Sequence, residues 1–495
     1  MKRIYGYIAV VLLICAMTVS CSKFLDFRPE ATMPSTGTDY GKSENIFSSV
    51  SAAYASLRGG HSFNYISLFE MTSDDADKGS TDSDSPEAKE MDSFTYTPSN
   101  SLINSVWVEF YNMASAANFA IEQMPKFEAQ MKTDSDREYT RQCAGEARII
   151  RAYAYFNLVR CFGRVPLIDR TMTSDELASM KQSSADDVYK FIYDDLDYAI
   201  ENIPASYDAS WSGRFTKYTA MALKAKAALY HGDWEECAKQ ADAVIASGRF
   251  SLLTSFREVF SIEGENSRES LMEVQSSTLG QSTGAAPYIE YAYVQGPRNN
   301  TPSNMQGWGF NVPSDALIAF LTDRGETVRM ATTLLYRGTT TPEGDYISDK
   351  CTNPVYNGKV YTPSAYNKWS YNGYGFDHNV RLIRYSDVLL MFAEARLNGA
   401  VSGTESGYTA DSALNEVRSR AGLPSVGATL ESVYDERRAE FAMEENRFFD
   451  LVRTGRAPAV LGPLGFKSGK NEVFPVPSAQ IQLNNNLERT AGYTY

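Results

Sequence analysis

The chain has 495 residues, with 61 acidic side chains against 47 basic ones and a formal net charge of −14. Such an acidic balance excludes nucleic acid and anionic lipid headgroups as expected partners. The hydrophobic content of 43% is normal for a globular protein, and the length allows two or three core-forming units or one large one.

Residues 1–20 have the pattern of a secretory signal peptide. Lys2 and Arg3 precede an apolar run at 8–17, and small residues then lead to Cys21. The run is shorter than the roughly 20 residues of a membrane-spanning helix. A cysteine at the cleavage point predicts a lipoprotein, with a lipid such as palmitate on the Cys21 sulfur and the protein body held at the membrane by acyl chains. Ordinary secretion, with Cys21 incidental, is the alternative.

The next segment, 21–43, contains proline and glycine without periodicity, and we interpret it as a lipidated tether. Apolar positions at helical spacing then predict four helices, over 44–58, 101–125, 135–162 and 185–202. Pro125 is expected to end the second helix. The third is apolar on two strips of its surface, which predicts packing between neighbouring helices.

The clearest local unit lies at 215–248. Two helical faces rich in alanine flank the turn His231-Gly232-Asp233, and small side chains at a contact let two helices approach closely. Asp233 followed by Glu236 indicates a capping box at the start of the second helix. The layout resembles a tetratricopeptide (TPR) hairpin, with a generic helical hairpin as the alternative. Trp107 and Trp234 lie on helix faces and are predicted to be core residues.

The composition changes between 270 and 380, where Gly, Pro, Asn, Thr and Tyr dominate and long helical periods are absent. Loops of this length are usually functional or disordered. Disorder would deplete aromatic residues, and this stretch is rich in them, so we expect an ordered, functional, loop-rich region.

Helices are expected again over 386–398, 410–420 and 430–452, followed by an irregular tail that packs back on the body. The last helix is dense in charge, and pairs such as Asp450 with Arg453 have helical spacing. Ion pairing between helices is the favoured interpretation, with catalysis as the alternative.

Six cysteines do not indicate a disulfide framework. Cys143 and Cys161 lie about 27 Å apart on one predicted helix and cannot pair. With Cys237 and Cys351 they are predicted to be small apolar core residues.

The search for an enzyme finds no motif. Three histidines lack metal-ligand spacing, and no nucleophile elbow, phosphate loop or HExxH sequence occurs. The acidic segment 73–86, with Asp74, Asp75, Asp77, Asp82 and Asp84, fails the EF-hand spacing, so a solvated loop is favoured over a calcium site. We expect no catalytic residue, no cofactor and no metal.

Several segments resemble one family in the same order. They are Cys21-Ser22-Lys23-Phe24-Leu25-Asp26 with Pro29, the stretch 146–167, Gly307-Trp308-Gly309, and the stretches 381–395, 414–423 and 436–455. On these motifs the chain resembles the SusD/RagB family of outer-membrane lipoproteins of Bacteroidetes over essentially its full length. The tail from Asn486 to Tyr493 departs from the usual proline and glutamine pattern.

The resemblance implies a mostly α-helical fold, with TPR-like hairpins at 44–269, a loop-rich, mixed ligand-binding region at 270–380, and C-terminal helices and tail at 381–495. It implies no catalysis. It implies a glycan-binding protein at the cell surface, anchored in the outer membrane by lipid, that serves as the lid of a SusC-like TonB-dependent transporter for nutrient import.

Aromatic rings cover the C–H faces of sugars, and polar side chains bind the hydroxyls. The expected ligand-binding residues are Trp308, Tyr288, Tyr291, Tyr293 and Asp75, with Trp369 and Tyr371 as second choices. Two rivals stay open, a peptide- or protein-binding member of the same family and a surface glycosidase.

Overall fold

The computed structural model describes residues 38–277, 289–301, 306–366 and 377–495. Most of the structure is helical, which confirms the predicted fold class. Cys21, most of the tether, Tyr288, Trp369 and Tyr371 lie outside the described residues.

The first half of the chain is built from helices. Their bounds are α2 (Ile46–Gly59), α3 (Phe63–Phe69), α4 (Pro86–Asp92), α5 (Ser101–Glu128), α6 (Asp134–Phe162), α7 (Ser174–Ser179), α8 (Ala185–Asn202), α9 (Lys217–His231) and α10 (Trp234–Ala246). Each predicted helix is present within about two residues, except that α5 runs on past Pro125 to Glu128. A proline there removes one helical hydrogen bond near the end of the helix, so the last turn survives it.

The second half combines shorter helices with two-stranded sheets. Its helices are α11 (Tyr291–Gln295), α12 (Asp315–Asp323), α13 (Thr327–Thr333), α14 (Tyr385–Leu397), α15 (Ala410–Arg420), α16 (Leu430–Phe441), α17 (Arg447–Arg453), α18 (Ala457–Leu461) and α19 (Ser478–Leu483). The strands are β1 (Ala76–Gly79), β2 (Ser270–Val274), β3 (Phe310–Pro313), β4 (Leu334–Tyr336), β5 (Val355–Asn357) and β6 (Val380–Arg384). The antiparallel pairs are β1–β3, β2–β6 and β4–β5.

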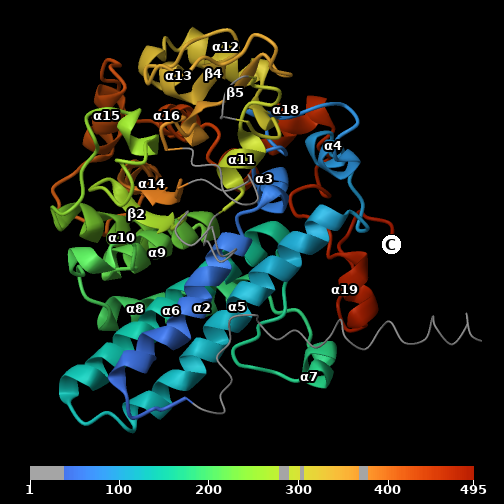
Figure 1. Ribbon diagram of the computed structural model, residues 1–495. Helices are drawn as coiled ribbons and strands as arrows, with labels where there is room; N and C mark the ends of the chain where they lie inside the picture. Colours follow the sequence, from blue (N-terminus) through green and yellow to red (C-terminus); the bar gives the residue numbers. More distant parts are fainter. Residues whose placement is uncertain (1–37, 278–288, 302–305, 367–376) are drawn as a thin grey trace, which may run out of the picture.

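The helices pack in series, α2 on α5, α5 on α6, α6 on α8, α8 on α9, α9 on α10 and α10 on α14. Figure 1 shows the long helices α2, α5 and α6 side by side at one end of the molecule, with α12, α13, β4 and β5 at the other. The largest apolar cluster includes Trp107, with Trp234 packed against it. The end with α12, α13, β4 and β5 has smaller clusters of its own. The predicted hairpin at 215–248 is α9 and α10, and Asp233 caps α10 by accepting a hydrogen bond from the Glu236 backbone N–H.

The predicted helix over 430–452 is two helices. The chain breaks at 442–446, where Met443 and Glu445 have φ of +64° and +57°, a conformation that ends a right-handed helix. The prediction of a solvated loop at 73–86 is also wrong for the first residues of that segment. Asp74 and Asp75 are buried, and residues 76–79 form β1.

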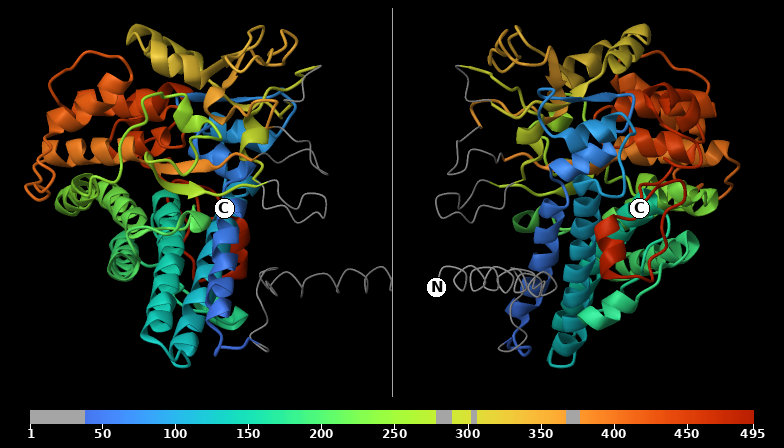
Figure 2. Two further views of the ribbon diagram at one scale, coloured as in Figure 1. Left: turned by 60° about the vertical axis from the view of Figure 1, so that its left-hand side comes forward. Right: turned by 90° about the vertical axis from the view of Figure 1, so that its right-hand side faces the viewer.

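The tail packs back on the body as expected. The Phe474 N–H donates to the Cys161 carbonyl (2.7 Å), and the Ser478 N–H donates to the Pro98 carbonyl (2.8 Å). Figure 2 shows α19 alongside the long helices, where Gln480 donates to Asn104 of α5. The four cysteines in the described ranges are free and buried, as predicted. Within those ranges no helix has both the length and the apolar character to cross a bilayer.

Candidate functional site

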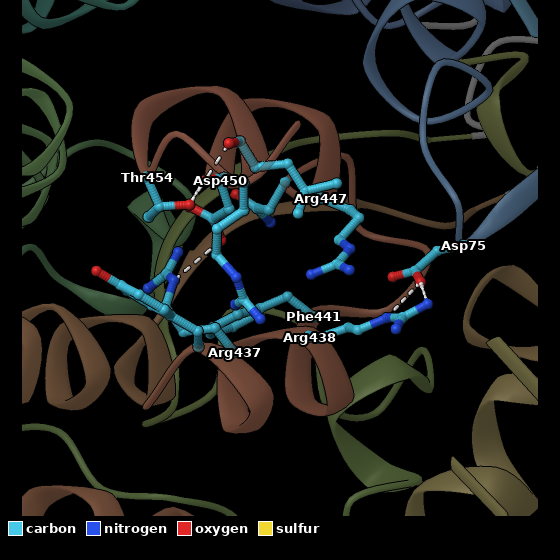
Figure 3. Close-up of a pocket in the computed structure, with 11 residues that line it drawn as sticks. Asp75, Arg437, Arg438, Phe441, Arg447, Asp450 and Thr454 are labelled. Atoms are coloured by element: carbon cyan, nitrogen blue, oxygen red, sulfur yellow. Dashed lines mark hydrogen bonds and ion pairs between the residues drawn. The ribbon is translucent and has the colours of Figure 1, made fainter. Parts of the chain in front are cut away.

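Asp75 lies in a charged pocket between β1 and the C-terminal helices (Figure 3). Its Oδ1 is 2.8 Å from Arg438 of α16, and the neighbouring Asp74 pairs with Arg438 and with Arg447 of α17, also at 2.8 Å. The Asp75 side chain is fully buried. The open volume of about 20 Å³ suits a water molecule rather than a sugar. Asp75 therefore ties the acidic segment to the C-terminal helices instead of facing a ligand.

The pKa values of Asp74 and Asp75 are shifted in opposite directions in this pocket. Burial raises the pKa of Asp75 despite the opposing charge of Arg438. Burial also opposes ionisation of Asp74, but the hydrogen bond and charge of Arg447 and the charge of Arg438 outweigh it and lower the pKa of that carboxyl. The pocket is thus a structural ion-pair cluster that joins segments far apart in the chain.

Tyr291, at the start of α11, is also buried. Its hydroxyl donates to the carboxylate of Glu445, in the break between α16 and α17. That carboxylate is close to Glu70, whose Oε2 accepts from the Glu445 N–H. Tyr291 therefore joins α11 to the break between α16 and α17 in the interior of the protein.

Trp308 and Tyr293 are brought together. The Trp308 N–H donates to the Tyr293 carbonyl (3.0 Å), and the two rings meet edge-on with centroids 5.7 Å apart. The chain must pass close to α11 here, because a Cβ on Gly307 would lie 2.4 Å from the Tyr293 carbonyl oxygen. Glycine at position 307 is thus required to seat Trp308 against α11.

The segment after β1 fixes Trp308 from the other side. The Ser80 hydroxyl donates to the Trp308 carbonyl (2.8 Å), and the Ser80 N–H donates to the Gly309 carbonyl (2.6 Å). The Nδ2 of Asn353, from the loop before β5, also donates to the Gly309 carbonyl (3.1 Å). Trp308 itself is half-buried.

Polar side chains are linked to the Trp308 backbone through Ser80. Arg298 donates to Ser80 (2.6 Å) and pairs with Asp84, and both charged side chains are about one-third exposed, 33% and 29%. A hydrogen bond from Thr81, helped by one from Ser80, lowers the pKa of Asp84 to about 2, so the carboxylate is ionised near neutral pH. We call Trp308, Tyr293, Ser80, Asp84 and Arg298 the Trp308 surface.

The Trp308 surface combines a held aromatic ring with partly exposed charged donors and acceptors, which suits a polyhydroxylated ligand. Of the predicted residues, Trp308 is half-buried there and Tyr293 is buried behind it, while Asp75 and Tyr291 are buried against other partners. Arg298 and Ser80 were not predicted, and Asp84 was considered only for calcium. Within the described ranges, no three His, Cys, Asp or Glu side chains are arranged to hold a metal ion.

Two family models match the chain. One, described as the SusD family, matches residues 268–493, and the other, described as starch-binding associating with outer membrane, matches residues 23–229. The chain belongs to the SusD/RagB family. The first match takes in the Trp308 surface residues from the second half, and the second takes in Ser80 and Asp84.

Relatives and solved SusD-like structures agree with this assignment. SusD-like protein P38 of Formosa agariphila is 26% identical over 527 aligned positions that cover 100% of both chains. A SusD-like protein of Bacteroides ovatus is 27% identical and covers 72% of this chain and 67% of its own length. The structure of a laminarin binding SusD-like protein has a TM-score of 0.79 at 27% identity, covering 91% of this chain and 99% of that one.

A further structure shows the same fold at lower identity. Surface glycan-binding protein A from Bacteroides thetaiotaomicron, in complex with laminarihexaose, has a TM-score of 0.76 at 23% identity. It covers 90% of this chain and 99% of its own.

Proposed function

We propose that this protein is a non-catalytic glycan-binding lipoprotein of the outer membrane, and that the Trp308 surface contacts the glycan. The observation that carries the proposal is the pairing of a held, half-buried Trp308 with Arg298 and Asp84. An indole ring covers the C–H face of a sugar, while a guanidinium and a carboxylate hydrogen-bond its hydroxyls. The 27% identical relative that is named for binding laminarin supports a glycan as ligand and makes laminarin the first one to test.

In the same proposal, the protein closes a SusC-like TonB-dependent transporter as its lid, and lid opening admits the captured oligosaccharide. The support for this part is family membership and the family description that places such proteins at the outer membrane. Lipid on Cys21 holds the lid at the cell exterior.

The test is isothermal titration calorimetry of the mature chain, residues 22–495, with laminarihexaose and a panel of other neutral glycans. We expect the glycan to bind without being cleaved. We expect Trp308→Ala to weaken the binding free energy by about 1–3 kcal/mol, the usual contribution of a stacking contact with an aromatic side chain. The control is Leu483→Ala, which removes an exposed apolar side chain from α19, an element that does not contribute to the Trp308 surface.

Three outcomes would contradict the proposal in different ways. Glycan binding that is insensitive to Trp308→Ala would move the site elsewhere. Cleavage of the glycan would make the protein a glycosidase. Transporter association without binding to any glycan of the panel would favour a peptide cargo.

A further inference from the structure

The helical body contains a second concavity, about 220 Å³ in volume, built from elements other than those that hold Trp308. One wall is α2, which contributes Phe47, Tyr54 and Arg58. The opposite wall is the segment 210–214 after α8, and the end of β2 contributes Glu273 and Gln275. The volume is below the ~300–1,000 Å³ of drug-sized ligand sites, so the cleft suits a single ring with its substituents.

The aromatic wall of this cleft presents an open ring. Trp211 is 43% exposed, and Phe47 meets it edge-on with centroids 5.1 Å apart. The Arg214 guanidinium lies 4.5 Å from the Phe47 centroid and 5.1 Å from that of Trp211. A partly exposed indole fixed in this way is a ready stacking platform.

Glu146 of α6 is fully buried and fixes the positions of Arg214 and Tyr54 in the lining of the cleft. Its carboxylate pairs with Arg214 and accepts hydrogen bonds from the hydroxyls of Tyr54 (2.6 Å) and Tyr207 (2.9 Å). The charge of Arg214 is therefore neutralised inside the protein. The geometry of the cleft exists before any ligand arrives, which lowers the cost of binding.

Arg58 differs from Arg214 because its guanidinium has no hydrogen-bond acceptor and no carboxylate partner among the described residues, although it is half-buried. Burial lowers the pKa of Arg58, and an arginine nevertheless stays charged in a protein. The carboxylate in the lining, Glu273, is already engaged by the Asn266 N–H (3.1 Å) and the Asn379 side-chain amide (2.8 Å). The cleft thus combines a stacking ring with an uncompensated cation.

We propose that this cleft binds a sugar residue that carries a carboxylate or a sulfate, with the sugar ring on Trp211 and the anionic group on Arg58. A sugar ring offers an apolar C–H face to the indole. An anionic substituent forms charge-assisted hydrogen bonds with the guanidinium, which are about twice as strong as neutral ones. A neutral glucan has the first feature and lacks the second, so the cleft would discriminate by charge.

The proposal is tested by calorimetry on the mature chain with three probes, which are trigalacturonate, a sulfated carrageenan oligosaccharide and neutral laminarihexaose. We expect at least one anionic probe to bind, both to the wild type and to Trp308→Ala. Arg58→Gln and Trp211→Ala should each weaken that binding about ten- to a hundredfold, as expected for loss of a charged hydrogen bond or of a stacking ring. Arg58→Lys should retain part of the affinity, because it keeps the charge and loses the bidentate geometry.

The two anionic probes separate a uronate from a sulfate as the preferred group. Failure of both to bind would overturn the proposal, and so would binding that Arg58→Gln leaves unchanged. Thermal melts of each variant check folding, and Trp211→Phe replaces Trp211→Ala if the latter does not fold. The effect of Trp308→Ala on laminarihexaose binding tests the Trp308 surface, and the effect of Arg58→Gln on binding of the anionic probes tests the cleft, so the two proposals fail separately.

Discussion

Glu440 lies at the centre of an ion-pair network in the second half of the molecule. Its carboxylate pairs with Arg329 of α13 (3.0 Å), with Arg384 at the end of β6 (2.8 Å) and with Arg420 of α15. Burial opposes ionisation, but the three guanidinium groups outweigh it and hold the pKa of Glu440 well below its ordinary value. One side chain thus connects three segments that are distant in the sequence.

Replacing Glu440 by glutamine should destabilise the protein by about 3–5 kcal/mol, because it leaves buried guanidinium groups short of negative charge. The matched control on the same helix is Glu431→Gln. Glu431 is 66% exposed and pairs with Arg456 at the surface. Replacing it should change the free energy of unfolding by no more than about 0.5 kcal/mol. Urea unfolding of both variants measures the difference, and equal midpoints would show that the network adds no stability.

Glu445 and Glu70 form a buried carboxyl pair beneath α11. Burial is the main cause that raises the pKa of Glu445 to about 8, and burial followed by the charge of Glu445 raises that of Glu70 well above its ordinary value. A carboxyl with a raised folded pKa holds its proton more tightly in the folded state than in the unfolded one. Its contribution to stability is therefore complete below about pH 4, the unfolded value, and falls as pH rises through the folded pKa.

Glu445→Gln should flatten this dependence between pH 5 and pH 8 and should make the protein more stable than the wild type at pH 8. The amide keeps an acceptor for the Tyr291 hydroxyl and carries no charge to bury. The measurement is the urea midpoint at several pH values, with the exposed Glu201→Gln as control. If the urea midpoints of the wild type and of Glu445→Gln change in parallel with pH, the raised pKa of Glu445 is contradicted.

Trp308 was chosen for its aromatic ring and for the family-like motif Gly307-Trp308-Gly309, and its role in ligand binding stays a prediction. The close approach at Gly307 explains the first glycine of that motif. Asp75 and Tyr291 were chosen for residue type alone, and their partners Arg438 and Glu445 lie 363 and 154 residues away. No spacing rule reports such a contact, so burial of these two could not be predicted from the sequence.

At the scale of elements, α6 is the helix on which the body is assembled, and it packs against α5 and α8. Arg151 of α6 forms a two-pronged ion pair with Asp195 of α8 at 2.7 Å. The close contact between the two helices is at Gly145, where a Cβ would lie 2.7 Å from Cγ1 of Ile203 and 3.4 Å from the Ala199 backbone.

Gly145→Ala should therefore destabilise the protein by about 1–2 kcal/mol. The overpacking cost of about 1–3 kcal/mol exceeds the gain of up to ~1 kcal/mol in helix propensity. Gly59→Ala, at the end of α2 with open space around the added methyl group, should be neutral or slightly stabilising. Thermal or urea unfolding distinguishes the two, and a stabilising Gly145→Ala would mean that Ile203 moves aside without cost.

Elements with long apolar periods were predicted almost to the residue, as α6 and α8 show. The elements that failed depend on tertiary contacts. Residues 76–79 become β1 by pairing with β3, more than two hundred residues later. The break between α16 and α17 is stabilised by the bond from the Glu445 N–H to Glu70. Helices α12 and α13 are only 9 and 7 residues long, too short for a clear period.

At the scale of the whole molecule, the proposed position at the membrane depends on one side chain. Cys21→Ser should release the protein from the membrane fraction and abolish labelling with palmitate, because the hydroxyl does not accept the lipid. Cys15→Ser, within the apolar run of the signal, is the matched control and should leave both unchanged. Detergent phase partitioning of the two variants measures this, and membrane retention of Cys21→Ser would contradict the lipoprotein assignment.

The packing of the tail has a consequence for the order in which the protein is made. The side-chain amide of Asn471 donates to the buried Tyr96 hydroxyl, the Phe474 N–H satisfies the Cys161 carbonyl, and Asn484 donates to the carbonyls of Leu177 and Met180. These bonds join the first half to residues that are synthesised about three hundred positions later. The helices of the first half therefore form before these interior contacts can, and their packing is completed only when the segment 471–484 has been made.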